Sequence, residues 1–196
     1  MMTIDRTHIC RVFAAYAARY DDTNPKIRLK IDHTYRVAAL CDEISQSLAL
    51  SSADRDLAWV IGMLHDVGRF EQVRRYNTFS DADSVDHAAL GVELLFEKGL
   101  IRDYLPDAHW DSLIRRAIAS HSLYRLPAGL SQRELLFCKL IRDADKIDIL
   151  KANCLTPMEE IYATTAEQLH KAAITPAVLN AFYEQHTVLR SLRKTP

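Results

Sequence analysis

The stretch "WVIGMLHDVGRF", residues 59–70, decides the fold and poses the first question about function. It begins as an apolar run of the kind that fills a protein core, and it ends in His65, Asp66 and Arg69. We interpret it as a buried helix that brings an imidazole, a carboxylate and a guanidinium to one place at its end. Since buried polar groups need partners, other parts of the chain must supply them.

Apolar residues recur at helical spacing along almost the whole chain. In residues 31–50, for example, one stripe holds Val37, Cys41 and Ile44. Alternating strand patterns are absent, and five glycines are too few for the turns of a β-sandwich. We expect an all-α, compact bundle of about seven or eight helices, near residues 5–20, 26–49, 53–67, 84–98, 108–121, 132–152, 157–173 and 176–192.

Several helix starts carry recognisable caps. A capping side chain stands before a proline at Asn24-Pro25, Thr156-Pro157 and Thr175-Pro176. The strings "SQRE" (131–134) and "TPME" (156–159) also fit the capping box. By contrast, "RFEQVRRYNTFSDAD" (69–83) is charged, aromatic and weakly periodic, so we expect a long loop there, either functional or simply solvated.

Length and composition indicate one soluble globular domain. The 196 residues suffice for a single sizeable core. As an alternative, the helices within 157–192 form a small appended lobe. The net charge of −1 argues against a surface that grips a nucleic-acid backbone, but it allows a small phosphorylated ligand.

No part of the chain resembles a membrane or secretion signal. No apolar run reaches the roughly 18 residues needed to cross a bilayer, and Asp5, Arg6 and His8 interrupt the N-terminus. The four cysteines lie far apart without a CxxC pair, so neither a zinc knuckle nor a disulfide framework is indicated. We expect a reduced, cytoplasmic protein.

Potential metal ligands recur at helix ends or on apolar helix faces. Asp145 follows Ile141 by four residues and His121 follows Ala117 by four, so both point toward the core. A bare carboxylate buried there is costly unless it is paired or bound to a metal. The residues that could share a cation are His33, His65, Asp66, His87, His121 and Asp145.

Mixed imidazole and carboxylate donors favour one or two divalent transition metals. They suit Mn, Fe, Co, Ni or Zn better than Ca, and Mg is also allowed. Because neighbouring residues on a helix point about 100° apart, His65 and Asp66 can share an ion only near the helix end. A metal so held lowers the pKa of bound water, which suits hydrolysis.

An H…HD…D signature, formed by His33, His65-Asp66 and Asp145, resembles that of the HD superfamily of metal-dependent phosphohydrolases. The strings "HTYRVA", "GMLHDVGR" and "RDADKID" look like segments of HD domains, and the likeness covers roughly residues 28–150. The resemblance implies a compact bundle of helices in which these four residues bind the metal.

Two further histidines match HD proteins that hold two metals. His87 and His121 stand where HD-GYP cyclic-di-GMP phosphodiesterases and HD-type symmetrical dinucleoside tetraphosphate hydrolases carry extra ligands. We expect them to hold a second metal or to act as acid and base. The chain has no GYP motif after His121, and Ser122 stands where HD-GYP enzymes have another histidine, so cyclic-di-GMP is not the expected substrate. The strings "RFEQ" and "SVDHA" resemble uncharacterised bacterial HD-domain hydrolases.

Charged residues beside these ligands suggest further roles. Arg69 follows the HDxG element where related hydrolases often carry Lys or Arg, and we expect it and Lys146 to bind a substrate phosphate. Asp86 and Asp148 are expected to orient a ligand or cap a helix. Asp66 is the candidate to orient or deprotonate the attacking water.

We therefore expect a metal-dependent phosphohydrolase. Metal-bound water would attack the phosphorus of a phosphomonoester, phosphodiester or phosphoanhydride, with a small nucleotide as the favoured substrate. Two alternatives stay open: a di-iron oxygenase on the same scaffold, and a degenerate module that binds a nucleotide and signals. Neither nucleic acid nor membrane is an expected partner, and a homodimer is left open.

Overall fold

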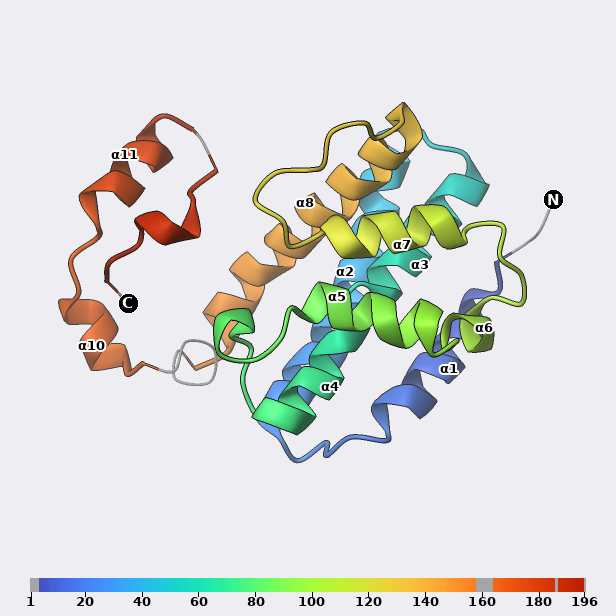
Figure 1. Ribbon diagram of the computed structural model, residues 1–196, viewed down its shortest axis with the longest axis horizontal. Helices are drawn as coiled ribbons and strands as arrows, with labels where there is room; N and C mark the ends of the chain where they lie inside the picture. The colour runs from blue at the N-terminus through green and yellow to red at the C-terminus, as the bar shows by residue number, and fades with distance from the viewer. Residues whose placement is uncertain (1–3, 158–163, 186, 196) are drawn as a thin grey trace. The chain divides into compact units, whose positions relative to one another are not determined.

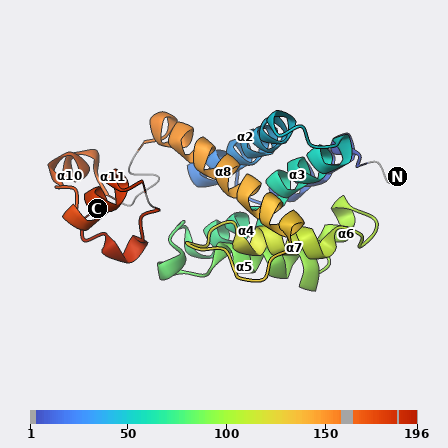
Figure 2. The ribbon, with the colours of Figure 1, turned by 90° about the horizontal axis from the view of Figure 1, so that it is seen from above.

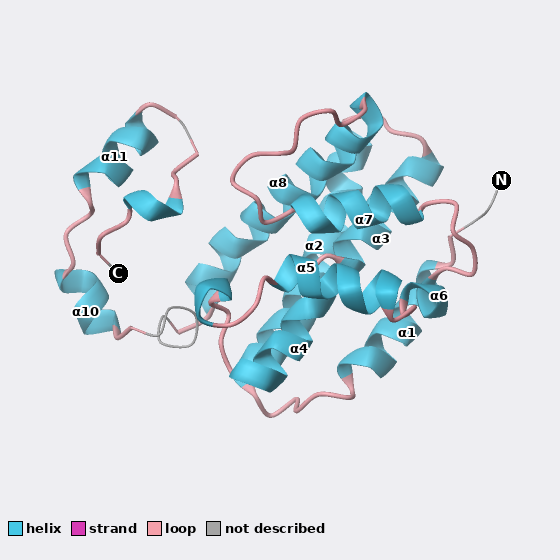
Figure 3. Ribbon diagram, in the orientation of Figure 1, coloured by secondary structure: helices cyan, strands magenta, loops and turns pink. Residues whose placement is uncertain are grey.

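The computed structural model describes residues 4–157, 164–185 and 187–195. These residues form helices and loops without a strand, so the all-α prediction is confirmed (Figure 3). The chain divides into two compact units, Met1–Cys154 and Leu155–Pro196. Within the described residues, no helix is long and apolar enough to span a membrane.

The first unit carries the candidate ligands. Its described elements, in chain order (Figure 1), are α1 (Arg6–Ala17), α2 (Pro25–Ser47), α3 (Ser52–Leu64), α4 (Val67–Tyr76), the 3-10 turn η1 (Asp81–Asp83), α5 (His87–Val92), the π-helical turn η2 (Glu93–Glu97), α6 (Ile101–Tyr104), α7 (Asp111–Ser120) and α8 (Gln132–Leu155). Those of the second unit are α10 (Ala166–Lys171), α11 (Pro176–Tyr183) and the 3-10 turn η3 (Arg190–Leu192).

Helix α3 lies deep in the first unit because its second half is apolar on every side. All residues from Leu57 to Leu64 are buried. Helix α2 packs closely against it at Gly62, where a Cβ would come within 2.7 Å of the Cα of Ala38. Helices α2, α3 and α8 form one layer of the unit, and α4, α5 and α7 form a second (Figure 2). Any site between these layers is shielded from solvent.

Helix α4 covers the first half of the loop predicted at 69–83, so that prediction is wrong there. Phe70 and Val73 are buried one turn apart, as expected of an amphipathic helix. The polar side chains of Glu71 and Gln72, between them, are buried as well. Because polar residues occupy buried positions here, the sequence shows no clear helical repeat of apolar residues, and a loop was predicted.

Two other helices of the first unit have different boundaries from those predicted. The helix predicted at 53–67 ends before Asp66, whose backbone leaves helical geometry. The helix predicted at 84–98 begins only at His87, because the carboxylate of Asp86 accepts hydrogen bonds from amides of the first turn. Both boundaries place candidate ligands at helix ends.

Two of the predicted caps are confirmed, and a third is confirmed in position but not in its hydrogen bond. Asn24 accepts the N–H of Lys26 at the start of α2, and the box over 131–134 is formed before α8. Thr175 stands at the N-cap of α11 before Pro176, as predicted, but its side chain makes no capping hydrogen bond, because its hydroxyl accepts the N–H of Lys194 instead.

The helices of the second unit are shorter than predicted. Part of the box predicted at 156–159 and part of the helix predicted at 157–173 lie outside the described residues, and α10 covers only the later part of that range. The helix predicted at 176–192 ends at Tyr183.

Gly68 on α4 allows α5 to approach closely. A Cβ at Gly68 would stand 2.2 Å from the carbonyl oxygen of His87, whereas a Cβ at the facing Gly91 would have no neighbour closer than 3.4 Å. We predict that Gly68→Ala lowers the free energy of unfolding by about 1–3 kcal/mol or more, because the helices must separate. Gly91→Ala should not lower it, since alanine favours a helix. Chemical denaturation compares the variants, and equal losses would contradict the prediction.

Candidate metal centre

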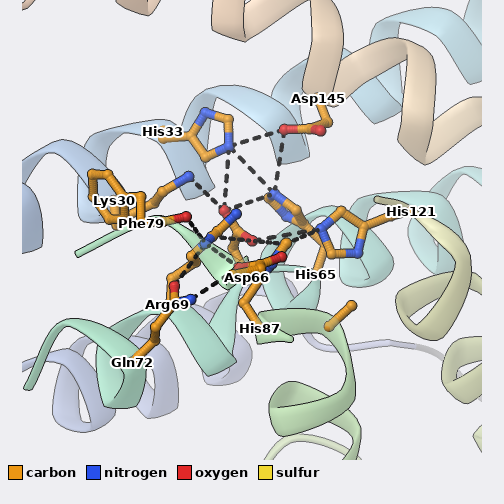
Figure 4. Close-up of polar contacts among 12 residues, drawn as sticks. Lys30, His33, His65, Asp66, Arg69, Gln72, Phe79, His87, His121 and Asp145 are labelled. Atoms are coloured by element: carbon orange, nitrogen blue, oxygen red, sulfur yellow. Dashed lines mark hydrogen bonds and ion pairs between the residues drawn. The ribbon is translucent and has the colours of Figure 1, made fainter. Parts of the chain in front are cut away.

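The predicted donors meet in one buried cluster between the two layers (Figure 4). Each is 6% exposed or less. The cluster joins residues that lie far apart in the sequence: His33 from α2, His65 and Asp66 from the turn between α3 and α4, His87 from α5, His121 from the end of α7 and Asp145 from α8.

Asp66 lies in the middle of the cluster and presents one oxygen to each of two groups. Its Oδ2 lies 3.6 Å from Nε2 of His33 and 3.5 Å from Nε2 of His65. Its Oδ1 lies 3.5 Å from Nε2 of both His87 and His121. Within each group the donor atoms lie within 4.8 Å of one another. We call these groups the first position (His33, His65, Asp66) and the second position (Asp66, His87, His121).

The backbone between α3 and α4 lets His65 and Asp66 serve the same site. His65 keeps helical dihedral angles, with φ −56° and ψ −37°, whereas Asp66 turns away, with φ −111° and ψ 18°. The Asp66 side chain makes no capping hydrogen bond to α4. It therefore faces the histidines, at the helix end where the sequence placed this pair.

Two histidines are held by the ends of their own helices. Nδ1 of His65 lies 2.7 Å from the carbonyl oxygen of Gly62, and Nδ1 of His121 lies 2.7 Å from that of Ile118. Because a carbonyl oxygen only accepts, both Nδ1 atoms carry the proton. In the neutral form, each ring therefore has an unprotonated, or bare, Nε2 atom directed at Asp66.

The other two histidines are held in the same tautomer by carboxylates. Nδ1 of His33 lies 2.6 Å from Oδ2 of Asp148, and Nδ1 of His87 lies 2.7 Å from Oδ2 of Asp81. Burial alone would raise the pKa of both carboxyl groups, but the hydrogen bonds from the histidines help to lower each pKa to about 2. Both carboxylates are thus ionised at neutral pH, and each accepts a hydrogen bond from an Nδ1–H group. Asp148 has the orienting role expected for it, and Asp86 the capping role.

This arrangement leaves bare nitrogen atoms facing each other. Nε2 of His33 and His65 lie 3.3 Å apart, and Nε2 of His87 and His121 lie 3.0 Å apart. Nitrogen ligands of one ion have about this separation when each lies about 2.1 Å from the metal. Oδ1 of Asp66 is also buried without a hydrogen-bond partner, whereas such atoms are normally satisfied. The donors therefore fit divalent transition metals.

The protonation states suit metal binding. Burial lowers the pKa of His87, which favours the neutral ring that a metal requires. Burial would raise the pKa of Asp66, but the charge of Lys30 helps to hold it well below its usual range. Nζ of Lys30 lies 2.6 Å from Oδ2 of Asp66. Lys30 was not among the residues predicted from the sequence, although its place three residues before His33, on the same face of α2, was a signal.

Asp145 joins the first position from α8. Its Oδ1 lies 3.2 Å from Nε2 of His33 and 3.9 Å from Nε2 of His65. Its Oδ2 accepts a hydrogen bond of 2.6 Å from Lys146. The Lys146 side chain is 58% exposed, so it both neutralises a candidate ligand and reaches solvent.

Arg69 lies beside Asp66 and is already engaged by the protein. Its Nη1 lies 2.6 Å from Oε1 of Gln72, 2.7 Å from the carbonyl oxygen of Phe79 and 2.8 Å from Oδ1 of Asp81. Its Nε is buried without a hydrogen-bond partner, 3.8 Å from Oδ1 of Asp66. Arg69 thus holds the segment after α4 in place, and phosphate binding by Arg69 and Lys146 stays a prediction.

Since Asp66 faces both positions, we predict that Asp66→Ala removes metal from both of them. His87→Ala should empty only the second position. Elemental mass spectrometry of the dialysed variants measures the metal content, with Asp83→Ala, at an exposed residue of η1, as the control. An Asp66→Ala chain that keeps one of two ions would contradict the shared carboxylate.

Comparison with known proteins agrees with this geometry. The family model described as HD domain matches residues 31–150, which is more than half of the chain and contains all the candidate ligands described above. No curated protein and no solved structure matches the chain. The chain therefore belongs to the HD-domain superfamily of metal-dependent phosphohydrolases.

Proposed function

We propose that this protein hydrolyses a phosphate ester or anhydride at a centre of two metal ions, and that its substrate is a nucleotide. The observation that carries the proposal is the carboxylate of Asp66, whose two oxygens face separate pairs of bare imidazole nitrogens. Pairs of metal ions about 3.5–4 Å apart are common in phosphatases and nucleases. Nucleotides come first among the substrates to test because the HD resemblance points to them.

Metal ions at these positions would polarise a phosphoryl oxygen and lower the pKa of a bound water. The residues of the chain supply the rest. Asp148 and Asp81 hold His33 and His87 in the tautomer that leaves Nε2 free. Both oxygens of Asp66 are turned toward the metal positions, which favours the role of a shared ligand over that of the general base predicted from the sequence.

Lys30 is the cation best placed to meet a substrate phosphate. Its ammonium group already contacts Oδ2 of Asp66, and its side chain is 14% exposed. Arg69 is occupied by three other acceptors. Lys146 pairs with Asp145, which faces only the first position, whereas Lys30 pairs with the carboxylate that faces both. A phosphoryl group near the first position would thus find Lys30 within reach.

The di-iron oxygenase and the degenerate binding module stay as alternatives. The same donors suit two irons, so oxygen consumption by the iron-loaded protein with a signal of a mixed-valence di-iron centre would favour an oxygenase. The complete donor set argues against a degenerate module, because a protein that only binds a nucleotide has no need of bare Nε2 atoms around a shared carboxylate.

The proposal is tested by phosphate release from the metal-loaded full-length chain. The panel contains p-nitrophenyl phosphate, bis(p-nitrophenyl) phosphate, nucleoside monophosphates and dinucleoside polyphosphates. We expect hydrolysis of at least one class and loss of that activity to background in Asp66→Ala, with Asp83→Ala unchanged. Full activity in Asp66→Ala, or no hydrolysis of any class by a protein that holds its metal, would refute the proposal.

Lys30→Met provides a second test. We predict that it keeps the metal but lowers kcat/KM by about 10–100-fold, the loss expected when a charge-assisted hydrogen bond to the substrate is removed. Lys146→Met should have a smaller effect, because Lys146 is more exposed. Inorganic phosphate inhibition, measured in parallel, should weaken in the Lys30 variant. Unchanged kcat/KM and unchanged phosphate inhibition would show that Lys30 does not contact the substrate.

A further inference from the structure

The two metal positions are anchored to the fold in different ways. Asp148, which holds His33, lies on the long helix α8, is 1% exposed and pairs with an arginine of α2. Asp81, which holds His87, lies on the short turn η1, and its side chain is 29% exposed. The second position therefore depends on residues 77–86, the surface segment that links α4 to α5.

This segment is fastened to α4 by Arg69 and Gln72, which both bind Asp81. Nη1 of Arg69 lies 2.8 Å, and Nε2 of Gln72 lies 2.9 Å, from the same oxygen, Oδ1. The other oxygen, Oδ2, accepts the hydrogen bond from the Nδ1–H group of His87. Gln72 is fully buried and makes further hydrogen bonds along residues 77–86. The two oxygens of Asp81 thus have separate partners, and its orientation is fixed.

We propose that Asp81 is the positioning residue of the second metal position: it holds His87 in the tautomer whose Nε2 is free for a metal, and Arg69 and Gln72 set its orientation. This inference rests on the two-metal centre of the proposed function. It separates the two positions, because the histidines of the first are held by Asp148 of α8 and by a carbonyl of α3, neither of which belongs to the segment 77–86.

Asparagine at position 81 tests the tautomer directly. Since Arg69 and Gln72 both donate to one oxygen, the amide of Asp81→Asn must keep its carbonyl toward them and turn its NH2 toward His87. An NH2 group only donates, so Nδ1 of His87 must then accept, and the ring proton moves to Nε2. A ring protonated at Nε2 cannot bind a metal through that atom. Asp81→Ala removes the hydrogen bond without imposing this tautomer.

The experiment is a Mn²⁺ titration of the metal-depleted full-length chain, with free Mn²⁺ measured by electron paramagnetic resonance. We expect Asp81→Asn to weaken binding of the second ion by about 10–100-fold and to leave the first unchanged. Asp81→Ala should weaken it no more than Asp81→Asn does. Asp83→Asn removes the same charge from an exposed residue of the same turn and should match the wild type. A His87→Ala chain shows which ion occupies the first position.

Nitrogen NMR of the metal-depleted chain, labelled at histidine, gives an independent readout. The His87 signal, identified by its loss in His87→Ala, should show the proton on Nδ1 in the wild type and on Nε2 in Asp81→Asn. A role of Asp81 in loop packing alone would not move this proton. Circular dichroism confirms that each variant is folded.

Several outcomes overturn the inference. One is an Asp81→Asn chain that binds both ions as tightly as the wild type. A second is an Asp81→Asn chain that loses affinity for both ions equally. A third is an Asp81→Asn chain that binds the second ion more tightly than Asp81→Ala does and also keeps the wild-type tautomer. The first of these refutes the role of Asp81 and leaves the two-metal phosphohydrolase standing. A wild-type chain that binds a single ion refutes the two-metal centre itself, and the role of Asp81 with it.

Discussion

The hydrogen bonds from the histidine Nδ1 atoms to oxygen are the interactions on which the site depends. Each fixes a ring so that a bare Nε2 points at Asp66. Without a cation, these nitrogens and the unpartnered Oδ1 of Asp66 would be buried without a donor between them, an arrangement that proteins normally avoid. The site thus makes sense as a place for metal ions, in agreement with the HD-domain family to which the chain belongs.

The acceptors of these hydrogen bonds are of two kinds. His65 and His121 stand just after the last residues of their helices, where carbonyl oxygens lack the usual N–H partner four residues later, and Nδ1 of each histidine donates to the carbonyl three residues earlier. His33 and His87 have no such carbonyl and use Asp148 and Asp81. A helix end therefore orients its own histidine, whereas a histidine elsewhere needs a carboxylate from another segment.

Close packing of the helices holds these histidines and their hydrogen-bond acceptors in place. The buried second half of α3 fixes where His65 and Asp66 emerge, and the absence of a side chain at Gly68 lets the start of α5, with His87, lie against α4. In the first position, the histidines are held by groups on α3 and α8, while the second position also relies on Arg69 and on the segment it holds. The proposed second position therefore depends more than the first on the conformation of a surface segment.

The sequence by itself determined the helical class and the set of candidate donors, because helical periodicity and the HD signature are local patterns that survive without coordinates. It did not reveal α4, since the buried Glu71 and Gln72 conceal its apolar face. It also did not show that Asp66 faces two pairs of histidines, or that Lys30 and Asp81 touch the site. Those facts depend on which side-chain atoms of separate helices meet, and only the packing of the two layers decides that.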